Sequence, residues 1–248
     1  MVSQYKTTVT LDNKTVVLII STQRAGSTLL KALLAQAPDV SHLPEINFHN
    51  YAGIKKAKKI VKLSHKPIIV LKHPMWFQEI FHYPKIPPVY RQKKIILTRD
   101  IYNNLHSVKK MLPDAMFIPE PVTNSKWLTN WLVRQYWCRF YQNIFSHPDL
   151  TDNDTYWLKY EDLLDDPLKI TAELFSFIGS KQKQGVDTYS PPEKTWRWGR
   201  DDGGSVIKTF KVQRKKSVKS SDPVLYECIN RSDMVKKIRQ RIGYTQPV

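Results

Sequence analysis

The residues best suited to chemistry lie first in a short loop, TQRAGST, at positions 22–28. Gly26 lets the backbone approach a ligand closely, and a helix starting just after it offers free N–H groups to an anion. Ser27 and Thr28 add hydroxyl groups, and Arg24 adds a fixed positive charge. These parts predict a phosphate-binding loop, while a simple capped turn between a strand and a helix is the alternative.

Two common nucleotide-binding motifs are absent from this loop. It has neither the GxxxxGK[ST] pattern of nucleoside triphosphatases nor the GxGxxG pattern of dinucleotide-binding proteins. ATP hydrolysis and dinucleotide binding are therefore disfavoured.

A second anion site is predicted around Arg99 and Ser107. Arg99 comes near the end of the apolar run KKIILTRD, and Ser107 follows it by eight residues. Both side chains can face one anion if a helix begins just after the strand, with Arg99 able to bind a phosphate through two N–H groups. The alternative is a strand end capped by Arg99 and Asp100, with Ser107 simply exposed. Only a nucleotide with phosphates at both ends of its ribose requires both sites.

Short apolar runs alternate with helical stretches along the chain. The runs predicted to be buried strands are residues 16–20, 67–73, 93–100 and 155–162, and the main helices are expected after Gly26 and at 101–111, 126–145, 168–178 and 232–241. This order predicts an α/β fold: a single P-loop-like domain over residues 1–248, with a central parallel sheet flanked by helices. Ligands of such sheets bind at the carboxyl ends of the strands, where Arg24, Lys72, Arg99 and Tyr160 would lie. From about residue 181 the pattern becomes less regular.

Composition restricts the class of protein without choosing the ligand. The chain has 248 residues, 39 Lys and Arg against 22 Asp and Glu, a net charge of +17, and 41% hydrophobic residues, which excludes a mainly disordered chain. The positive charge would attract nucleotides, nucleic acids or acidic membranes alike. No membrane span, signal peptide or metal-ligand spacing around Cys138 and Cys228 is visible, so we expect a cytoplasmic protein that holds no metal and binds no membrane.

These motifs together resemble a known family. TQRAGSTLL resembles the 5′-phosphosulfate loop of sulfotransferases that use 3′-phosphoadenosine 5′-phosphosulfate (PAPS), commonly PRSGTTLL, with Gln23 in place of the usual Pro. The pair Arg99 and Ser107 resembles the family's 3′-phosphate motif, and YEDLLDDP with the helix after it resembles the block that places a Tyr, here Tyr160, near the adenine. The resemblance implies PAPS as cofactor, with its 5′-phosphosulfate held by Arg24, Ala25, Gly26, Ser27, Thr28 and Leu29.

The resemblance also implies the catalytic groups. Tyrosylprotein sulfotransferases and several bacterial relatives carry a Glu base in the loop that corresponds to Glu45, whereas many cytosolic sulfotransferases use a His near the strand end of His73. We favour Glu45, because VLKHP resembles the KDP segment of the tyrosylprotein enzymes, which aligns Lys72 with the residue that stabilises the transition state. Arg24 is the fourth catalytic candidate.

The carboxy-terminal segment from Trp196 to Lys219 resembles the family's mobile loop that closes over the cofactor. It combines Gly203 and Gly204 with a run of basic residues, although it does not align residue by residue. Ser205, Lys208 and Arg214 are its candidate cofactor contacts, and a flexible basic loop without a ligand is the alternative.

The acceptor is not specified by the sequence. Aromatic residues that follow Glu45 and Lys72 are candidates for its pocket or for the core: His49, Tyr51, Trp76, Phe77, Phe81 and Tyr83. We expect a small metabolite or natural product with a hydroxyl or amine, and peptide tyrosine is the alternative. A nucleic-acid-binding module and a nucleotide kinase are the competing functions, but no RNA- or DNA-binding motif supports the first. No signal for an oligomeric state stands out.

Overall fold

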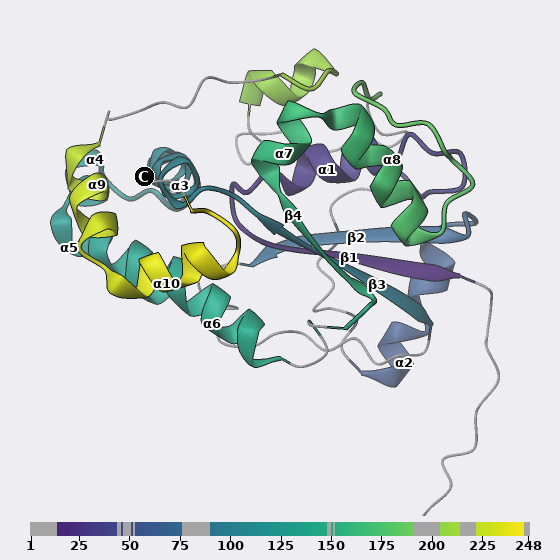
Figure 1. Cartoon of the computed structure of the whole chain (residues 1–248), viewed down its shortest axis with the longest axis horizontal. Helices are drawn as coiled ribbons and strands as arrows, with labels where there is room; N and C mark the ends of the chain where they lie inside the picture. Colours follow the sequence, from purple (N-terminus) through teal and green to yellow (C-terminus); the bar gives the residue numbers. More distant parts are fainter. Residues whose placement is uncertain are drawn as a thin grey trace, which may run out of the picture.

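The computed structural model describes residues 14–43, 46, 51, 53–75, 90–147, 150, 152–190, 204–213 and 222–245. A four-stranded sheet in the order β2-β1-β3-β4 forms the centre, and every neighbouring pair of strands is parallel (Figure 1). The strands are β1 (Thr15–Thr22), β2 (Ile68–Met75), β3 (Arg91–Thr98) and β4 (Thr155–Lys159). The predicted parallel α/β sheet is thus confirmed. Within the described ranges, no helix is both long and apolar enough to cross a membrane.

Strand β1 is buried on both faces and separates two hydrophobic cores. Val16, Leu18 and Ile20 belong to one core, and Val17 and Ile19 belong to the other. This explains the uninterrupted apolar run, because a strand covered on both sides has no solvent-facing positions. Figure 1 shows α1, α7 and α8 on one side of the sheet and α6 and α10 on the other.

The helices that form these two layers have the following bounds. The layer over Val17 and Ile19 consists of α1 (Ser27–Leu34), α7 (Tyr160–Asp165) and α8 (Pro167–Ile178). The opposite layer is built mainly from α3 (Ile101–Met116), α5 (Lys126–Trp131), the π-helical segment η3 (Leu132–Cys138), α6 (Arg139–Ser146), α9 (Pro223–Asn230) and α10 (Asp233–Arg241). Shorter elements are α2 (Ile54–Ala57), η2 (Ile60–Leu63), α4 (Glu120–Thr123) and η6 (Gly204–Thr209).

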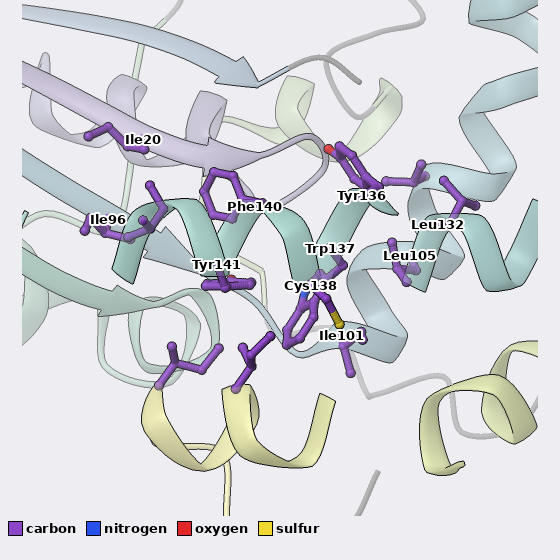
Figure 2. Close-up of a cluster of buried hydrophobic side chains, with 14 of the residues drawn as sticks. Ile20, Ile96, Ile101, Leu105, Leu132, Tyr136, Trp137, Cys138, Phe140 and Tyr141 are labelled. Atoms are coloured by element: carbon purple, nitrogen blue, oxygen red, sulfur yellow. The ribbon is translucent and has the colours of Figure 1, made fainter. Parts of the chain in front are cut away.

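The segments α5, η3 and α6 run on without a break and fill the helix predicted at 126–145. Their large aromatic residues Tyr136, Trp137, Phe140 and Tyr141 are almost fully buried, in the core that also contains Ile20 of β1 and Ile96 of β3 (Figure 2). The π-helical turn of η3 was not predicted, because its apolar spacing does not differ from that of an α-helix over so few residues. Such turns are frequent at functional sites, and this one carries Tyr136.

Three local features differ from the sequence prediction or were not part of it. The predicted strand at 155–162 ends at Lys159, because Glu161 and Asp162 occupy the first turn of α7, where acidic groups complement the helix dipole. Helix α1 is capped by Gly26, with no side-chain cap from Ser27 or Thr28. Helix α9 was not predicted at all, although its start has the usual pattern of an Asp cap followed by Pro.

A buried ion pair joins α9 to α3. The Lys109 ammonium of α3, 4% exposed, lies 2.5 Å from the Asp222 carboxylate, which also caps α9 through the N–H of Leu225 at 2.9 Å. Burial acts to raise the pKa of Asp222. The hydrogen bonds from Lys109 and Leu225 and the nearby positive charges outweigh the effect of burial, so the pKa lies below its usual value. A lowered folded-state pKa means that this stabilisation is present at neutral pH and is lost as the pH falls through the acid range.

We predict that Asp222→Ala lowers the free energy of unfolding by about 3–5 kcal/mol at pH 7, because it leaves the Lys109 charge buried without its partner. Denaturant unfolding measures the loss. Lys236→Ala is the control, since it removes the exposed ion pair with Asp233 on α10 and should change little. Equal losses in the two variants would contradict the assignment of the Lys109–Asp222 pair as the anchor of α9.

Candidate active site

The turn between β1 and α1 forms the centre of the candidate site. Two of its residues have positive φ angles, 61° at Arg24 and 101° at Gly26. Because Gly26 is the N-cap of α1 and has no side chain, the first N–H groups of that helix open onto the turn. The partial positive charge of the helix start therefore faces this position, as a phosphate loop requires.

A buried amide holds the turn against α3. Asn104 is fully buried; its Nδ2 donates to the Gln23 carbonyl at 2.8 Å, and its Oδ1 accepts from the Thr22 hydroxyl at 3.1 Å. The N–H of Gln23 donates to the Tyr136 hydroxyl at 2.7 Å, and Figure 2 shows that hydroxyl directed at the loop after β1. Asn104 and Tyr136 thus set the path by which the chain leaves the sheet.

Neither Asn104 nor Tyr136 was a predicted site residue. Asn104 does give a sequence signal, because it shares the helical spacing of the apolar residues Ile101, Leu105 and Val108 and so falls on the buried face of α3. A polar amide at such a position needs hydrogen-bond partners, which predicts a structural or functional contact. Tyr136 gives no comparable signal, because aromatic residues on a buried helix face are ordinary core residues.

Arg99 and Ser107 meet the turn at its Arg24 end. The Arg99 guanidinium donates from Nη1 to the Arg24 carbonyl at 2.6 Å, and the Arg24 guanidinium donates from Nε to the Ser107 hydroxyl at 3.1 Å. The two predicted anion sites are therefore adjacent and connected through Arg24. Among the described residues, the buried Nε of Arg99 has no hydrogen-bond partner, which is a cost that a bound acceptor group would remove.

Lys72 meets the turn at its other end. It lies on β2 opposite Ile19 of β1, is 3% exposed, and donates from Nζ to the Thr28 hydroxyl at 2.7 Å. Thr28 belongs to the first turn of α1, so the ammonium group adds its charge to the partial charge of the helix start. A phosphate or sulfate group at α1 would be within the field of both.

Tyr160 closes the turn from the β4 side. Its ring lies so close to Gly26 that a Cβ atom at that position would be 2.3 Å from two ring carbons. The Arg99 guanidinium stacks over the same ring with 4.8 Å to its centroid. Burial raises the pKa of the Tyr160 hydroxyl, while the positive charges of Arg99 and Arg24 act in the opposite direction. The Tyr160 ring therefore lies against both Gly26 of the turn and the Arg99 guanidinium.

A carboxylate ties together the strand ends that carry Arg99 and Tyr160. Glu161 follows Tyr160 and accepts the N–H of Asp100, the residue after Arg99, at 3.0 Å. Its second oxygen accepts the hydroxyl of Tyr244 at 2.5 Å. In the sequence, Glu161 gives a signal only as part of the YEDLLDDP block, and Tyr244, which is far away in the chain, gives none.

The remaining predicted residues are described only in part. Glu45 and Arg214 lie outside the described residues, and for His73 and Ser205 the structure describes the backbone alone, in β2 and η6. Lys208 of η6 is exposed. Of the acceptor-pocket candidates, Tyr51 is described and is partly buried against the core, whereas His49, Trp76, Phe77, Phe81 and Tyr83 lie outside the described residues.

The segment that contains η6 packs over the same layer as α1. Ile207 is buried in the core shared with α1 and α8, and its carbonyl accepts the Tyr189 hydroxyl at 2.9 Å. Backbone hydrogen bonds also join Tyr189 to Phe210 and Val212 to Asp187. These contacts place residues 204–213, the described part of the predicted cofactor-covering segment, on the α1 side of the sheet.

Fold and site together define an α/β protein with a P-loop-like fold, whose turn between β1 and α1 has the groups that an anion site requires. A family profile described as "Sulfotransferase family" matches residues 17–184, which include the turn, Lys72, Arg99, Ser107 and Tyr160. The chain belongs to the sulfotransferase family, a family of enzymes. A search of curated protein sequences finds no match.

Solved structures with the same fold include other sulfotransferases. The sulfotransferase domain of the Synechococcus PCC 7002 olefin synthase superimposes with a TM-score of 0.59 at 15% identity, covering 95% of this chain and 97% of that one. The sulfotransferase domain from the curacin biosynthetic pathway gives a TM-score of 0.51 at 17% identity, covering 94% and 99%. A mouse sulfotransferase complexed with PAP gives 0.51 at 13% identity, covering 93% and 90%.

The contact between Gly26 and Tyr160 gives a stability prediction. Gly26→Ala should lower the free energy of unfolding by about 1–3 kcal/mol more than Gly179→Ala, because only the first substitution also forces a methyl group into a ring. Gly179, the C-cap of α8, is the matched control: its φ is also positive, at 77°, but a Cβ there would meet nothing within 4 Å. Denaturant unfolding measures both.

A double substitution separates the ring contact from the backbone strain. Tyr160→Ala should remove most of the excess loss of Gly26→Ala, so that the two substitutions are not additive. Strict additivity would mean that the ring does not limit position 26.

Proposed function

We propose that this enzyme transfers a sulfuryl group from PAPS to a hydroxyl or amine of a small acceptor molecule. The observation that carries the proposal is the adjacency of two anion-binding positions around one turn. One position is formed by the start of α1 with Thr28 and Lys72, and the other by Arg99 and Ser107. A nucleotide with a 5′-phosphosulfate and a 3′-phosphate would use both.

The residues present fit such a nucleotide. The N–H groups of residues 25–29, with the hydroxyls of Ser27 and Thr28, suit the 5′-phosphosulfate, and the unsatisfied Nε of Arg99 suits an additional anionic acceptor. PAP, adenosine 3′,5′-bisphosphate, is the ligand of the similar mouse sulfotransferase and would be the product left after sulfuryl transfer. Tyr160, stacked beneath Arg99, would border the nucleoside, and Ser205, Lys208 and Arg214 remain proposed contacts of the covering segment.

The chemistry needs a base and a cation. The acceptor oxygen or nitrogen forms a bond to sulfur while the bond from sulfur to the 5′-phosphate oxygen breaks, and the acceptor proton passes to a base. We assign the base to Glu45, with His73 as the alternative. Lys72, held at 2.7 Å from Thr28, is placed to stabilise the negative charge that develops on the departing phosphate.

The acceptor that we propose is a small biosynthetic molecule. The similar domains of an olefin synthase and of the curacin biosynthetic pathway support a small biosynthetic molecule over peptide tyrosine. Nucleic-acid binding without catalysis is the competing function, because many of the basic residues, such as Lys55, Lys56, Lys58 and Lys59, are exposed. A thermal-shift comparison of PAP with an oligonucleotide distinguishes the two functions.

A thermal-shift titration tests the cofactor assignment. A ligand at about 100 times its Kd stabilises the folded state by about 2.7 kcal/mol. For a chain of this size that corresponds to a rise in Tm of about 5–10 °C. We expect this rise with PAP and a much smaller one with AMP or ATP at the same concentration and ionic strength.

A different ligand ranking would contradict the proposal. Stabilisation by ATP together with acceptor phosphorylation would indicate a nucleotide kinase. Stabilisation by an oligonucleotide alone, with a steep dependence on salt, would indicate that the protein binds nucleic acid through its basic surface.

The base assignment is tested by kinetics with PAPS and an acceptor found by screening. Glu45→Gln should lower kcat by about 100- to 10,000-fold and leave the Kd for PAP unchanged, because it removes a proton acceptor and no phosphate contact. His73→Ala is the comparison. If His73→Ala costs more in kcat than Glu45→Gln, His73 is the base instead.

A further inference from the structure

A groove with a volume of about 390 Å³ lies between α6 and α10, on the side of the sheet opposite to α1 (Figure 1). None of its lining residues belongs to the candidate active site. The lining includes Gln142 and Phe145 of α6 and Met234, Lys237, Ile238 and Arg241 of α10.

The groove follows the two helices lengthwise. Its lining residues on α10 run from position 234 to position 241, which is two helical turns or about 10 Å. At one end, the Gln142 amide donates to the Met234 sulfur at 3.5 Å, and at the other the Arg241 guanidinium lies 3.8 Å from the centroid of the Phe145 ring. The space between the helices therefore has the length of two turns of a third helix.

Apolar side chains form the floor and one end of the groove. Ile238 is almost fully buried at its base, whereas Met234 is 43% exposed. Trp157 of β4 stacks on Phe145, with 5.9 Å between the ring centroids, and is itself 37% exposed. Exposed apolar groups gathered around one groove are typical of an interaction site, and a flexible Met adapts to the shape of a partner.

The rim of the groove is positively charged. Lys237 and Arg241 are exposed and four residues apart, so they lie on the same face of α10. Among the described residues, neither of them forms an ion pair and no acidic residue lines the groove. The carboxylate of Asp233, near the start of α10, is paired with Lys236 at 2.9 Å. The two cations are thus available to acidic groups of a partner.

Shape and charge together restrict the occupant. The groove is open along one side, so a small molecule in it would stay largely in water, whereas a helix laid across it would cover the opening. A nucleic acid would match the two cations but would have no aliphatic side chains to pack on Ile238 and Met234. The net charge of +17 attracts an acidic partner and repels a second copy of the chain.

We propose that the groove between α6 and α10 binds an acidic amphipathic helix of a partner protein. Apolar side chains of that helix, spaced three and four residues apart, pack against Met234, Ile238 and Phe145. Its Asp or Glu side chains pair with Lys237 and Arg241 at the rim. This interaction surface is separate from the proposed sulfuryl transfer and does not depend on it.

Fluorescence anisotropy of a labelled synthetic peptide tests the proposal on the full chain. The probe is an amphipathic helix of about 15 residues, long enough to form a helix, with Leu on one face and Glu on the other. We expect saturable binding with a Kd of about 1–100 μM, as for a small transient interface, that weakens as the salt concentration rises. A matched peptide with Lys in place of every Glu should bind at least about 10-fold more weakly.

Three charge substitutions on α10 locate the binding surface. Met234→Glu and Lys237→Glu each place a carboxylate in the groove, and each should raise the Kd of the Glu peptide by about 10-fold or more through like-charge repulsion. Lys236→Glu is the matched control, because it changes the net charge as Lys237→Glu does but lies outside the groove lining. It should alter the Kd by less than about threefold. All three side chains are exposed, and thermal melting confirms that the variants fold.

The proposal is overturned if the Glu peptide shows no saturable binding, or if Lys237→Glu and Lys236→Glu weaken it equally. The second result would mean that net charge alone attracts the peptide. Parallel assays with an oligonucleotide, with vesicles of phosphatidylserine and phosphatidylcholine, and by sedimentation of the protein alone identify another occupant. Binding or dimerisation that Met234→Glu abolishes, without peptide binding, would assign the groove to that occupant instead. None of these outcomes affects the cofactor assignment, because none depends on PAP.

Discussion

The structure depends on one constraint: the chain must leave the carboxyl end of β1 through a tight turn while its polar groups are buried. Asn104 meets that constraint, because its amide satisfies Gln23 and Thr22 where water is excluded. Without those bonds, the buried carbonyl of Gln23 would lose its partner at a cost of about 1–3 kcal/mol. The same bonds fix the turn relative to α3, and therefore fix the distance between the two proposed anion-binding positions.

Other contacts keep α3 itself in place. Glu161 joins the ends of β3 and β4 through Asp100, and Tyr244 from the last described segment binds the same carboxylate. Lys109 on α3 pairs with Asp222 at the start of α9. The carboxy-terminal helices thus stabilise α3, the helix that carries Ser107. Activity is expected to depend on these distant residues through the position of α3, not through contact with the nucleotide.

The sequence predicts the sheet, and which residues form the site, better than it predicts the contacts among those residues. The strands were predictable because β1 to β3 are apolar runs buried on both faces, and the site because parallel strands bring Arg24, Lys72 and Arg99 to one edge. The contact between Arg24 and Ser107 was not predictable, because it depends on a left-handed φ at a non-glycine residue. Tyr136 and Tyr244 act through contacts between distant segments, which local patterns do not encode. The roles of Glu45 and His73 remain predictions.

The central claim is that one site holds phosphates at both ends of a ribose. Phosphorus NMR of PAP during titration with the protein tests it most directly, because the 3′- and 5′-phosphates give separate resonances. The account predicts that both resonances shift on binding to the wild-type protein, and that Arg99→Ala reduces the shift of the 3′-phosphate while the 5′-phosphate still responds. A shift confined to one phosphate in the wild-type protein, or none at either, would contradict it.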